Sequence, residues 1–252
     1  MTEPSQDRDN RFYPLPCLIT LASLFCGFYA IVAAINSEFK TAAIAVLVAS
    51  IFDALDGRVA RMTQSTSQFG AELDSLCDMV SFGVSPAVLV FLWALHPYGR
   101  YGWLAAFLYV AMTSLRLARF NTQDTDSGSK NFVGLPCPAA AAMISASILF
   151  CHFLGIDGEV QHISLLFLVY VLSYLMVSTH TYCSFKEVSG LKAKPFQILI
   201  ALLLLFILVA AEPQIMIFSL FLIYLASGPL YGLIRKLRSS KPLALSFKKK
   251  DK

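Results

Sequence analysis

The chain is poor in charge. Only 14% of its 252 residues are Asp, Glu, Lys or Arg, whereas 57% are hydrophobic, and soluble domains carry about 25% charged residues. So few charges exclude an ordinary soluble enzyme. The mean hydropathy of +0.65, with the apolar residues in long blocks, instead indicates a polytopic membrane protein.

The chain also lacks features that mark other classes of protein. Its six cysteines are scattered through apolar segments without CxxC spacing, which disfavours a disulfide framework and a zinc site. The basic residues form no groove interleaved with aromatic residues, which excludes nucleic acid as a partner. The chain has no repeat and no linker rich in Pro, Gly or Ser. We therefore expect one membrane domain, residues 16–236, between an N-terminal arm, residues 1–15, and a basic tail, residues 237–252.

Eight apolar blocks predict transmembrane helices. Each has about 17–21 residues, enough to cross a hydrocarbon core of roughly 30 Å. The predicted fold is therefore an all-α bundle of about eight helices in a lipid bilayer. The blocks are residues 16–36, 41–60, 76–95, 101–118, 136–154, 162–180, 195–211 and 214–234.

The basic residues predict the orientation of these spans. Eighteen of the twenty Lys and Arg residues fall in the termini and in alternate loops, which leaves Lys40 and Arg100 for the opposite side. Basic residues mark the cytoplasmic side of a membrane protein. We therefore expect both termini in the cytoplasm and a location in a bacterial inner membrane.

Four aspartates lie near the ends of two apolar blocks, where an unpaired charge is costly. Asp53 and Asp56 have i, i+3 spacing, and Asp74 and Asp78 have i, i+4 spacing, so each pair projects from one face of a helix. Two such faces in contact would gather four carboxylates that repel one another unless divalent cations neutralise them. Ligands that are all oxygen favour Mg²⁺ or Mn²⁺. The expected site faces the cytoplasm.

The residues between the two pairs indicate a phosphate ligand. Gly57 and Ala60 are small, so a bulky ligand can approach the helix backbone there. Arg61 offers a guanidinium fork suited to phosphate oxygens. Metal, phosphate and close backbone approach together favour a nucleoside diphosphate.

The stretch Asp53-x2-Asp56-Gly57-x2-Ala60-Arg61-x8-Gly70-x3-Asp74-x3-Asp78 resembles, without a gap, the signature of the CDP-alcohol phosphotransferase family. The resemblance implies transfer of a phosphoryl group from a CDP-linked donor, here CDP-diacylglycerol, to an acceptor hydroxyl with release of CMP. It also implies a homodimer.

The same resemblance implies residue roles. One metal ion would be bound by Asp53, Asp56 and Asp74, and the second by Asp53, Asp74 and Asp78, with Asp78 as the general base. The residues implied to bind the CDP moiety are Gly57, Ala60, Arg61, Ser67, Gly70 and Thr20.

Further short matches resemble members of this family that use L-serine as the acceptor. The implied contacts to serine or to a donor phosphate are Arg116, Arg119, Asn121 and Lys186. The matches are Leu15-Pro16 with Thr20, Phe25-Cys26-Gly27, Arg116-Leu117-Ala118-Arg119-Phe120-Asn121, Phe132-x-Gly134-Leu135-Pro136-x-Pro138-Ala139, Leu175-Met176-Val177-Ser178 and Tyr182-x-Ser184-Phe185-Lys186.

The sequence departs from the family pattern at two positions. Cys17 and Ser23 stand where the family often has asparagine. If those asparagines bind the donor, this chain must use Thr20, Ser23 or backbone groups instead.

Three alternative interpretations stay open at this point. A sister enzyme would use glycerol 3-phosphate, choline or inositol as the acceptor. A transporter would use the carboxylates to bind cations, although transport sites usually lie near the bilayer midplane. In a structural network, Arg58 and Arg61 would pair with the aspartates, yet two arginines cannot neutralise four aspartates.

Overall fold

The computed structural model describes residues 14–63, 67–122, 134–156, 162–178 and 212–239. Within these residues the chain is helical and has no strand. The helices are α1 (Pro14–Ile35), α2 (Phe39–Met62), α3 (Gln68–Asp78), α4 (Ser85–Val90), α5 (Arg100–Thr122), α6 (Cys137–Phe153), α7 (Ile163–Val177) and α9 (Pro213–Ser239), with π-helical η1 (Met79–Val84) and η2 (Phe91–Leu95) and the 3₁₀ turn η3 (His96–Tyr98). The predicted all-α fold is confirmed for this part of the chain.

The predicted apolar blocks coincide with these helices. The exception is the block at residues 195–211, which lies outside the described residues, as do most of the terminal arm and tail. Two helical runs, Leu15–Ile35 and Gln68–Tyr98, are long and apolar enough to cross a membrane, and α6, α7 and Pro213–Gly228 are shorter apolar helices. The count of eight spans and the orientation of the termini therefore stay predictions.

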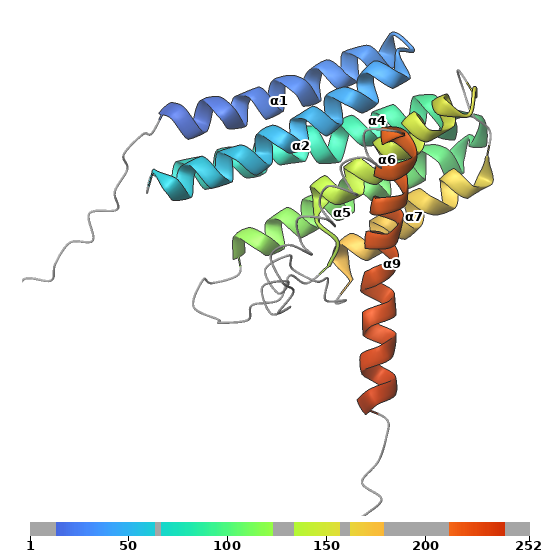
Figure 1. The fold of residues 1–252 in the computed structure, drawn as a ribbon. Coiled ribbons are helices and arrows are strands. Elements are labelled where there is room, and N and C mark those ends of the chain that lie inside the picture. Colours follow the sequence, from blue (N-terminus) through green and yellow to red (C-terminus); the bar gives the residue numbers. More distant parts are fainter. Residues whose placement is uncertain (1–13, 64–66, 123–133, 157–161, 179–211, 240–252) are drawn as a thin grey trace, which may run out of the picture.

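The helices α1 and α2 lie side by side, and α2 also contacts α6 (Figure 1). The run from α3 to η3 packs against both α1 and α5, and α7 packs against α5. The helix α9 contacts α6 and runs across the direction of the other helices (Figure 1). Residues 214–234 thus form a helix as predicted, but one that does not run alongside the rest.

The side chains of α1 are sorted by size. Its buried face, which packs against α2 and the run from α3 to η2, includes Ala30, Ala33 and Ala34, whereas Phe25 and Phe28 on the outer face are 70% and 59% exposed. Small residues facing inward and large apolar residues facing outward are the reverse of the arrangement in a soluble protein, and they suit a helix in lipid.

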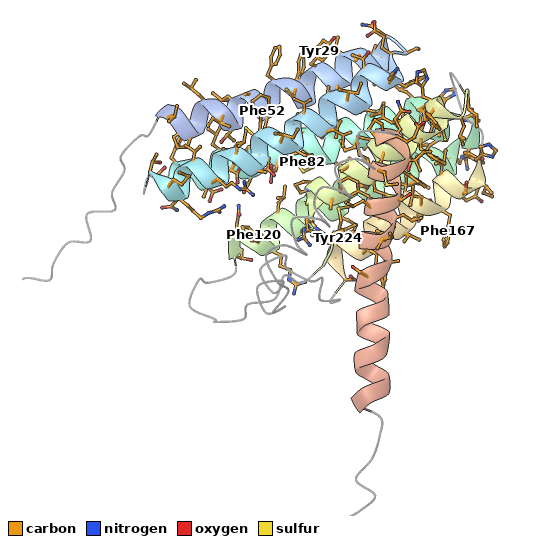
Figure 2. All side chains as sticks on the ribbon, viewed as in Figure 1. Tyr29, Phe52, Phe82, Phe120, Phe167 and Tyr224 are labelled. Atoms are coloured by element: carbon orange, nitrogen blue, oxygen red, sulfur yellow. The ribbon has the colours of Figure 1, made fainter. Side chains whose placement is uncertain are left out.

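Other helices show the same outward apolar surface. Figure 2 shows Tyr29 and Phe167 on the outside of the bundle, and they are 45% and 70% exposed. Phe82, in contrast, lies between helices and is fully buried. A lipid environment would cover this exposed apolar surface.

Candidate metal and nucleotide site

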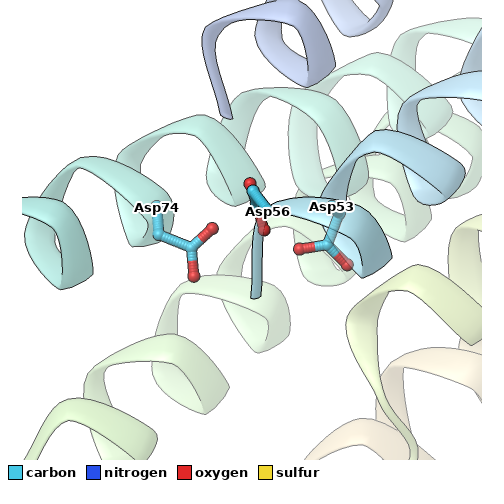
Figure 3. Close-up of side chains that lie close together, drawn as sticks. All are labelled: Asp53, Asp56 and Asp74. Carbon is cyan, nitrogen blue, oxygen red and sulfur yellow. The ribbon is translucent and has the colours of Figure 1, made fainter. Parts of the chain in front are cut away.

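Two helices supply the aspartates. The second half of α2 carries Asp53 and Asp56, and α3 carries Asp74 and ends at Asp78. One carboxylate oxygen from each of Asp53, Asp56 and Asp74 lies within 4.8 Å of the others, and Figure 3 shows the three carboxylates pointing toward one another. The side chain of Asp78 lies within hydrogen-bonding reach of Asp53. The structure therefore groups Asp53, Asp56 and Asp74 as the sequence predicted, with Asp78 beside Asp53 at the end of α3.

The site leaves buried oxygens without partners. Asp56 is only 5% exposed, and its Oδ2 atom has no hydrogen-bond partner, nor has the Oδ1 atom of Asp74. A buried polar atom without a partner destabilises the fold, and like charges at this separation repel one another. A divalent cation would satisfy both oxygens and neutralise the charge. The donor set, carboxylate oxygen alone, fits Mg²⁺ or Mn²⁺.

The nearby arginines do not neutralise the cluster. Among the residues described, neither Arg58 nor Arg61 forms an ion pair with the four aspartates, and both arginines are exposed. The Arg61 guanidinium folds back along its own helix, where Nη1 lies 3.6 Å from the position of a Cβ atom placed on Gly57. A structural network of these arginines with the aspartates is therefore not what the structure shows.

A small pocket adjoins Asp56 and Asp74. Its volume is about 150 Å³, and its walls come from α1, α2 and the start of α3. Most of the residues expected to bind the nucleotide line it, whereas Arg61 does not. The lining residues are Pro16, Cys17, Thr20, Asp56, Gly57, Ala60, Ser67, Gly70, Ala71 and Asp74.

Two of the pocket hydroxyls also have structural contacts. Ser67 is the N-cap of α3, because its Oγ atom accepts a hydrogen bond from the Gly70 backbone N–H at 3.1 Å. Thr20 donates to the Pro16 carbonyl at 3.1 Å and lies within hydrogen-bonding reach of the Asp56 carboxylate. These contacts fix the position of both hydroxyls at the pocket wall.

The two departures from the family pattern have different surroundings. Cys17 lines the pocket. Ser23 does not line the pocket. Its side chain is buried, and its hydroxyl donates to the Ala49 carbonyl of α2 at 3.1 Å. Thr20, one of the two residues that could replace the missing asparagines, therefore lines the pocket, whereas the other, Ser23, connects α1 to α2. Pro16 and Cys17, which are not among the residues predicted to bind the nucleotide, also line the pocket, and their spacing to Thr20 places all three on one helical face.

The residues expected near the acceptor do not form one cluster. Arg116 donates from Nη1 to the Met176 carbonyl at the end of α7, at 3.0 Å. Arg119 is exposed on α5. Asn121 is hydrogen-bonded to Ser75 of α3. Lys186 lies outside the described residues, and none of the other three lines the pocket.

Gly134 completes the surroundings of Arg116. A Cβ atom at this glycine would lie 2.5 Å from the Met176 carbonyl oxygen and 2.8 Å from Arg116 Nη1, and its φ of +85° favours glycine. The next residue, Leu135, donates its N–H to the Leu175 carbonyl at 3.0 Å. Arg116 therefore takes part in the junction of α5, α7 and the segment before α6.

Comparison with known proteins is consistent with this arrangement. The family model described as CDP-alcohol phosphatidyltransferase matches residues 13–175. A CDP-diacylglycerol–serine O-phosphatidyltransferase of Helicobacter pylori is 37% identical over 218 residues, which cover 85% of this chain and 90% of that protein.

Two further relatives come from an archaeon and from another bacterium. An archaetidylserine synthase of Methanothermobacter thermautotrophicus is 37% identical over 68% of this chain and 70% of its own length. A CDP-diacylglycerol–serine O-phosphatidyltransferase of Bacillus subtilis is 33% identical over 69% of this chain and 92% of its own length. Together with the aspartate cluster and the adjoining pocket, these matches show that the chain belongs to the CDP-alcohol phosphatidyltransferase family.

Proposed function

We propose that this protein transfers the phosphatidyl group of CDP-diacylglycerol to the hydroxyl of L-serine, giving phosphatidylserine and CMP. The observation that carries the proposal is the group of Asp53, Asp56 and Asp74 beside a pocket lined with small residues. Family membership supports the donor, and the printed names of the relatives support serine as the acceptor.

The reaction replaces a phosphoanhydride bond of the donor with a phosphodiester bond to the acceptor. A bond forms between the serine hydroxyl oxygen and the phosphorus that carries the diacylglycerol, and the bond from that phosphorus to the bridging oxygen of CMP breaks. The hydroxyl proton passes to Asp78, the proposed general base. CMP leaves with the electron pair of the broken bond, so no oxidant or reductant is needed.

The aspartates are proposed to hold two divalent cations, Mg²⁺ or Mn²⁺. Asp53, Asp56 and Asp74 would bind one, and Asp53, Asp74 and Asp78 the other. When bound, such ions neutralise charge on the pyrophosphate and on the leaving group. The unpartnered oxygens of Asp56 and Asp74 support this assignment.

The pocket is proposed to bind part of the nucleotide. Gly57, Ala60 and Gly70 have little or no side chain, so that the CDP moiety can approach the helix backbone at the pocket wall. Thr20 and Ser67 offer hydroxyls for hydrogen bonds. Arg61, which lies outside the lining but on the same helix as Gly57, would bind a phosphate oxygen after swinging away from its own helix.

A larger apolar cavity supports a path for the acyl chains. It has a volume of about 690 Å³ and lies between α2, the start of α6 and α9. Its lining includes Ala54, which follows Asp53 along α2. We therefore propose that the acyl chains lie on the side of α2 that contacts α6.

The proposed acceptor site centres on the end of α5. Arg116 and Arg119 are proposed to bind the serine carboxylate and a donor phosphate, with Lys186 as a further phosphate ligand. Arg119 is exposed, so its side chain can turn toward a ligand. Arg116 would bind a ligand while its Nη1 atom donates a hydrogen bond to the Met176 carbonyl. We further propose a homodimer in the bacterial inner membrane, with the site facing the cytoplasm.

The test is direct incorporation of serine. Protein purified in detergent is supplied with CDP-diacylglycerol, Mn²⁺ and radiolabelled L-serine, and the label is followed into lipid while CMP is measured. Parallel reactions contain glycerol 3-phosphate, inositol or choline. Label in lipid with serine, absent from an Asp78→Asn variant, supports the proposal. Turnover with one of the other acceptors in place of serine would make the protein a sister enzyme, and absence of CMP release would favour a cation-binding transporter.

A further inference from the structure

The helix α1 contributes no aspartate, yet it is hydrogen-bonded to α2 and to η1, the segment that directly follows α3. Ser23 donates from its hydroxyl to the Ala49 carbonyl of α2 at 3.1 Å. The backbone carbonyl of the same Ser23 accepts a hydrogen bond from the Ser81 hydroxyl of η1 at 3.2 Å. One residue of α1 therefore connects α2 to η1.

The two bonds end close to the metal site along the chain. Ala49 lies one helical turn before Asp53, and Ser81 lies three residues after Asp78. Asp53 and Asp78 are within hydrogen-bonding reach of each other. The connection through Ser23 thus links α2 to the segment that directly follows Asp78, about one helical turn from these two carboxylates.

Close packing reinforces the connection between α1 and η1. A Cβ atom on Gly27 would lie 2.6 Å from both the Cα and the Oγ atoms of Ser81. Only glycine permits this approach of the two backbones. Ser23 and Ser81 are 2% and 0% exposed, so water does not compete for their hydrogen bonds, and loss of one of these bonds would not be made up by solvent.

The segment that receives this contact is unusual in itself. It is π-helical from Met79 to Val84 and begins directly after Asp78. On its other side, Tyr109 of α5 donates its hydroxyl to the Phe82 carbonyl at 3.1 Å. Since π-helical turns are stable only where packing supports them, contacts on both sides fix where α3 ends and therefore where Asp78 lies.

We propose that Ser23, Gly27 and Ser81 are positioning residues that set the separation of the Asp53 and Asp78 carboxylates and so tune the affinity of the site for divalent cations. The inference rests on the metal site of the proposed function. It gives α1 a second role beside its contribution to the pocket wall through Thr20.

The experiment measures Mn²⁺ binding without turnover. Purified wild-type protein, Ser23→Ala and Ser81→Ala are titrated with Mn²⁺ in the absence of substrates, and free Mn²⁺ is quantified by electron paramagnetic resonance. Thermal unfolding is recorded for each protein in EDTA. The matched control is Ser147→Ala, because Ser147 is a buried serine whose hydroxyl donates to Met143 of its own helix, at 2.8 Å, and joins no second helix.

We expect the Mn²⁺ Kd to rise about three- to tenfold in Ser23→Ala and in Ser81→Ala, with the Kd of Ser147→Ala unchanged. Gly27→Ala forces α1 away from η1 and should raise the Kd by at least about tenfold. If Gly27→Ala does not fold, the two serine variants still decide the question.

Unchanged Mn²⁺ affinity in both serine variants, with a loss of thermal stability like that of Ser147→Ala, would show that the contacts are merely structural and would overturn the inference. A wild-type protein that binds no Mn²⁺ would instead refute the metal site of the proposed function. The two failures are therefore distinguishable.

Discussion

Asn121 and Ser75 exchange hydrogen bonds across two helices. The Asn121 amide donates from Nδ2 to Ser75 Oγ at 3.0 Å, and Oδ1 of the same amide lies 3.1 Å from that hydroxyl, which can donate to it. The contact joins the last turn of α5 to α3 at the residue that follows Asp74. Asn121 is predicted at the acceptor site, and the structure shows that it also bonds to a residue of the aspartate-bearing helix α3.

This contact leads to a first prediction. Replacing Asn121 with Ala should lower kcat about three- to tenfold, because α3 is held less firmly, and should change the KM for serine by less than about twofold. Ser75→Ala should have the same effect, and the double variant should be no worse than the worse single variant, because both remove one interaction. Steady-state kinetics on the four proteins make the comparison. A large rise in the KM for serine with an unchanged kcat would instead support Asn121 as a ligand of serine.

A second prediction concerns the general base. Asp78→Asn keeps the size of the side chain but removes the proton acceptor, so turnover should fall by at least about 10². Binding of Mn²⁺ and of CDP-diacylglycerol should be partly retained, because three aspartates remain. CMP release and Mn²⁺ titration on the same preparation separate the two effects. A rate equal to that of the wild type would remove Asp78 from the mechanism.

A third prediction follows from the buried, unpartnered Oδ2 atom of Asp56. In EDTA, Asp56→Asn should unfold about 2–4 °C above the wild type, because one of the repelling charges is gone. With saturating Mn²⁺ the order should reverse, since only the wild type gains the full stabilisation of a bound ion. Thermal unfolding in the two buffers measures both. The same order in both buffers would mean that Asp56 does not bind the ion.

A fourth prediction tests the pocket. A Cβ atom on Gly57 meets nothing closer than the mobile end of Arg61, at 3.6 Å, so Gly57→Ala should fold normally. The methyl group would enter the ligand space and raise the KM for CDP-diacylglycerol about tenfold, with Mn²⁺ affinity unchanged. Arg58→Ala, at the exposed position that follows Gly57, is the control, and its KM for CDP-diacylglycerol should equal that of the wild type. An unaltered KM in Gly57→Ala would place the nucleotide elsewhere.

A fifth prediction tests the acyl path. Ala142 lines the cavity of about 690 Å³ beside α2, and Ala142→Phe would fill part of it. The KM for long-chain CDP-diacylglycerol should rise about tenfold, while a donor with short acyl chains should be little affected. Ala106→Phe is the matched control, because it fills a separate apolar cavity of about 380 Å³. Equal effects in the two variants would point to general disruption of packing.

The sequence predicted the features of the site that depend on local periodicity. The i, i+3 and i, i+4 spacings of the aspartates are properties of single helices, so the faces they share follow from the sequence alone. Their convergence requires two helices to pack, and the structure shows it for Asp53, Asp56 and Asp74. The metal count and the role of Asp78 stay predictions.

The sequence could not predict which polar groups find backbone partners. The acceptor of Arg116 is the carbonyl of Met176, sixty positions away, and a carbonyl has no signature in the sequence. The same holds for Ser23 and the Ala49 carbonyl. The π-helical turn after Asp78 could not be predicted either, because the apolar block that contains it predicts an uninterrupted α-helix.

The sorting of α1 by size has a consequence for tolerance to mutation. Ala30 and Ala34 are fully buried in the hydrophobic core, so a larger side chain there should be harmful even when it is apolar. Around Phe25 and Phe28, one apolar residue should replace another freely, because lipid adapts to any shape. In a deep mutational scan of this helix, the smallest residues should therefore tolerate the fewest substitutions and the largest residues the most.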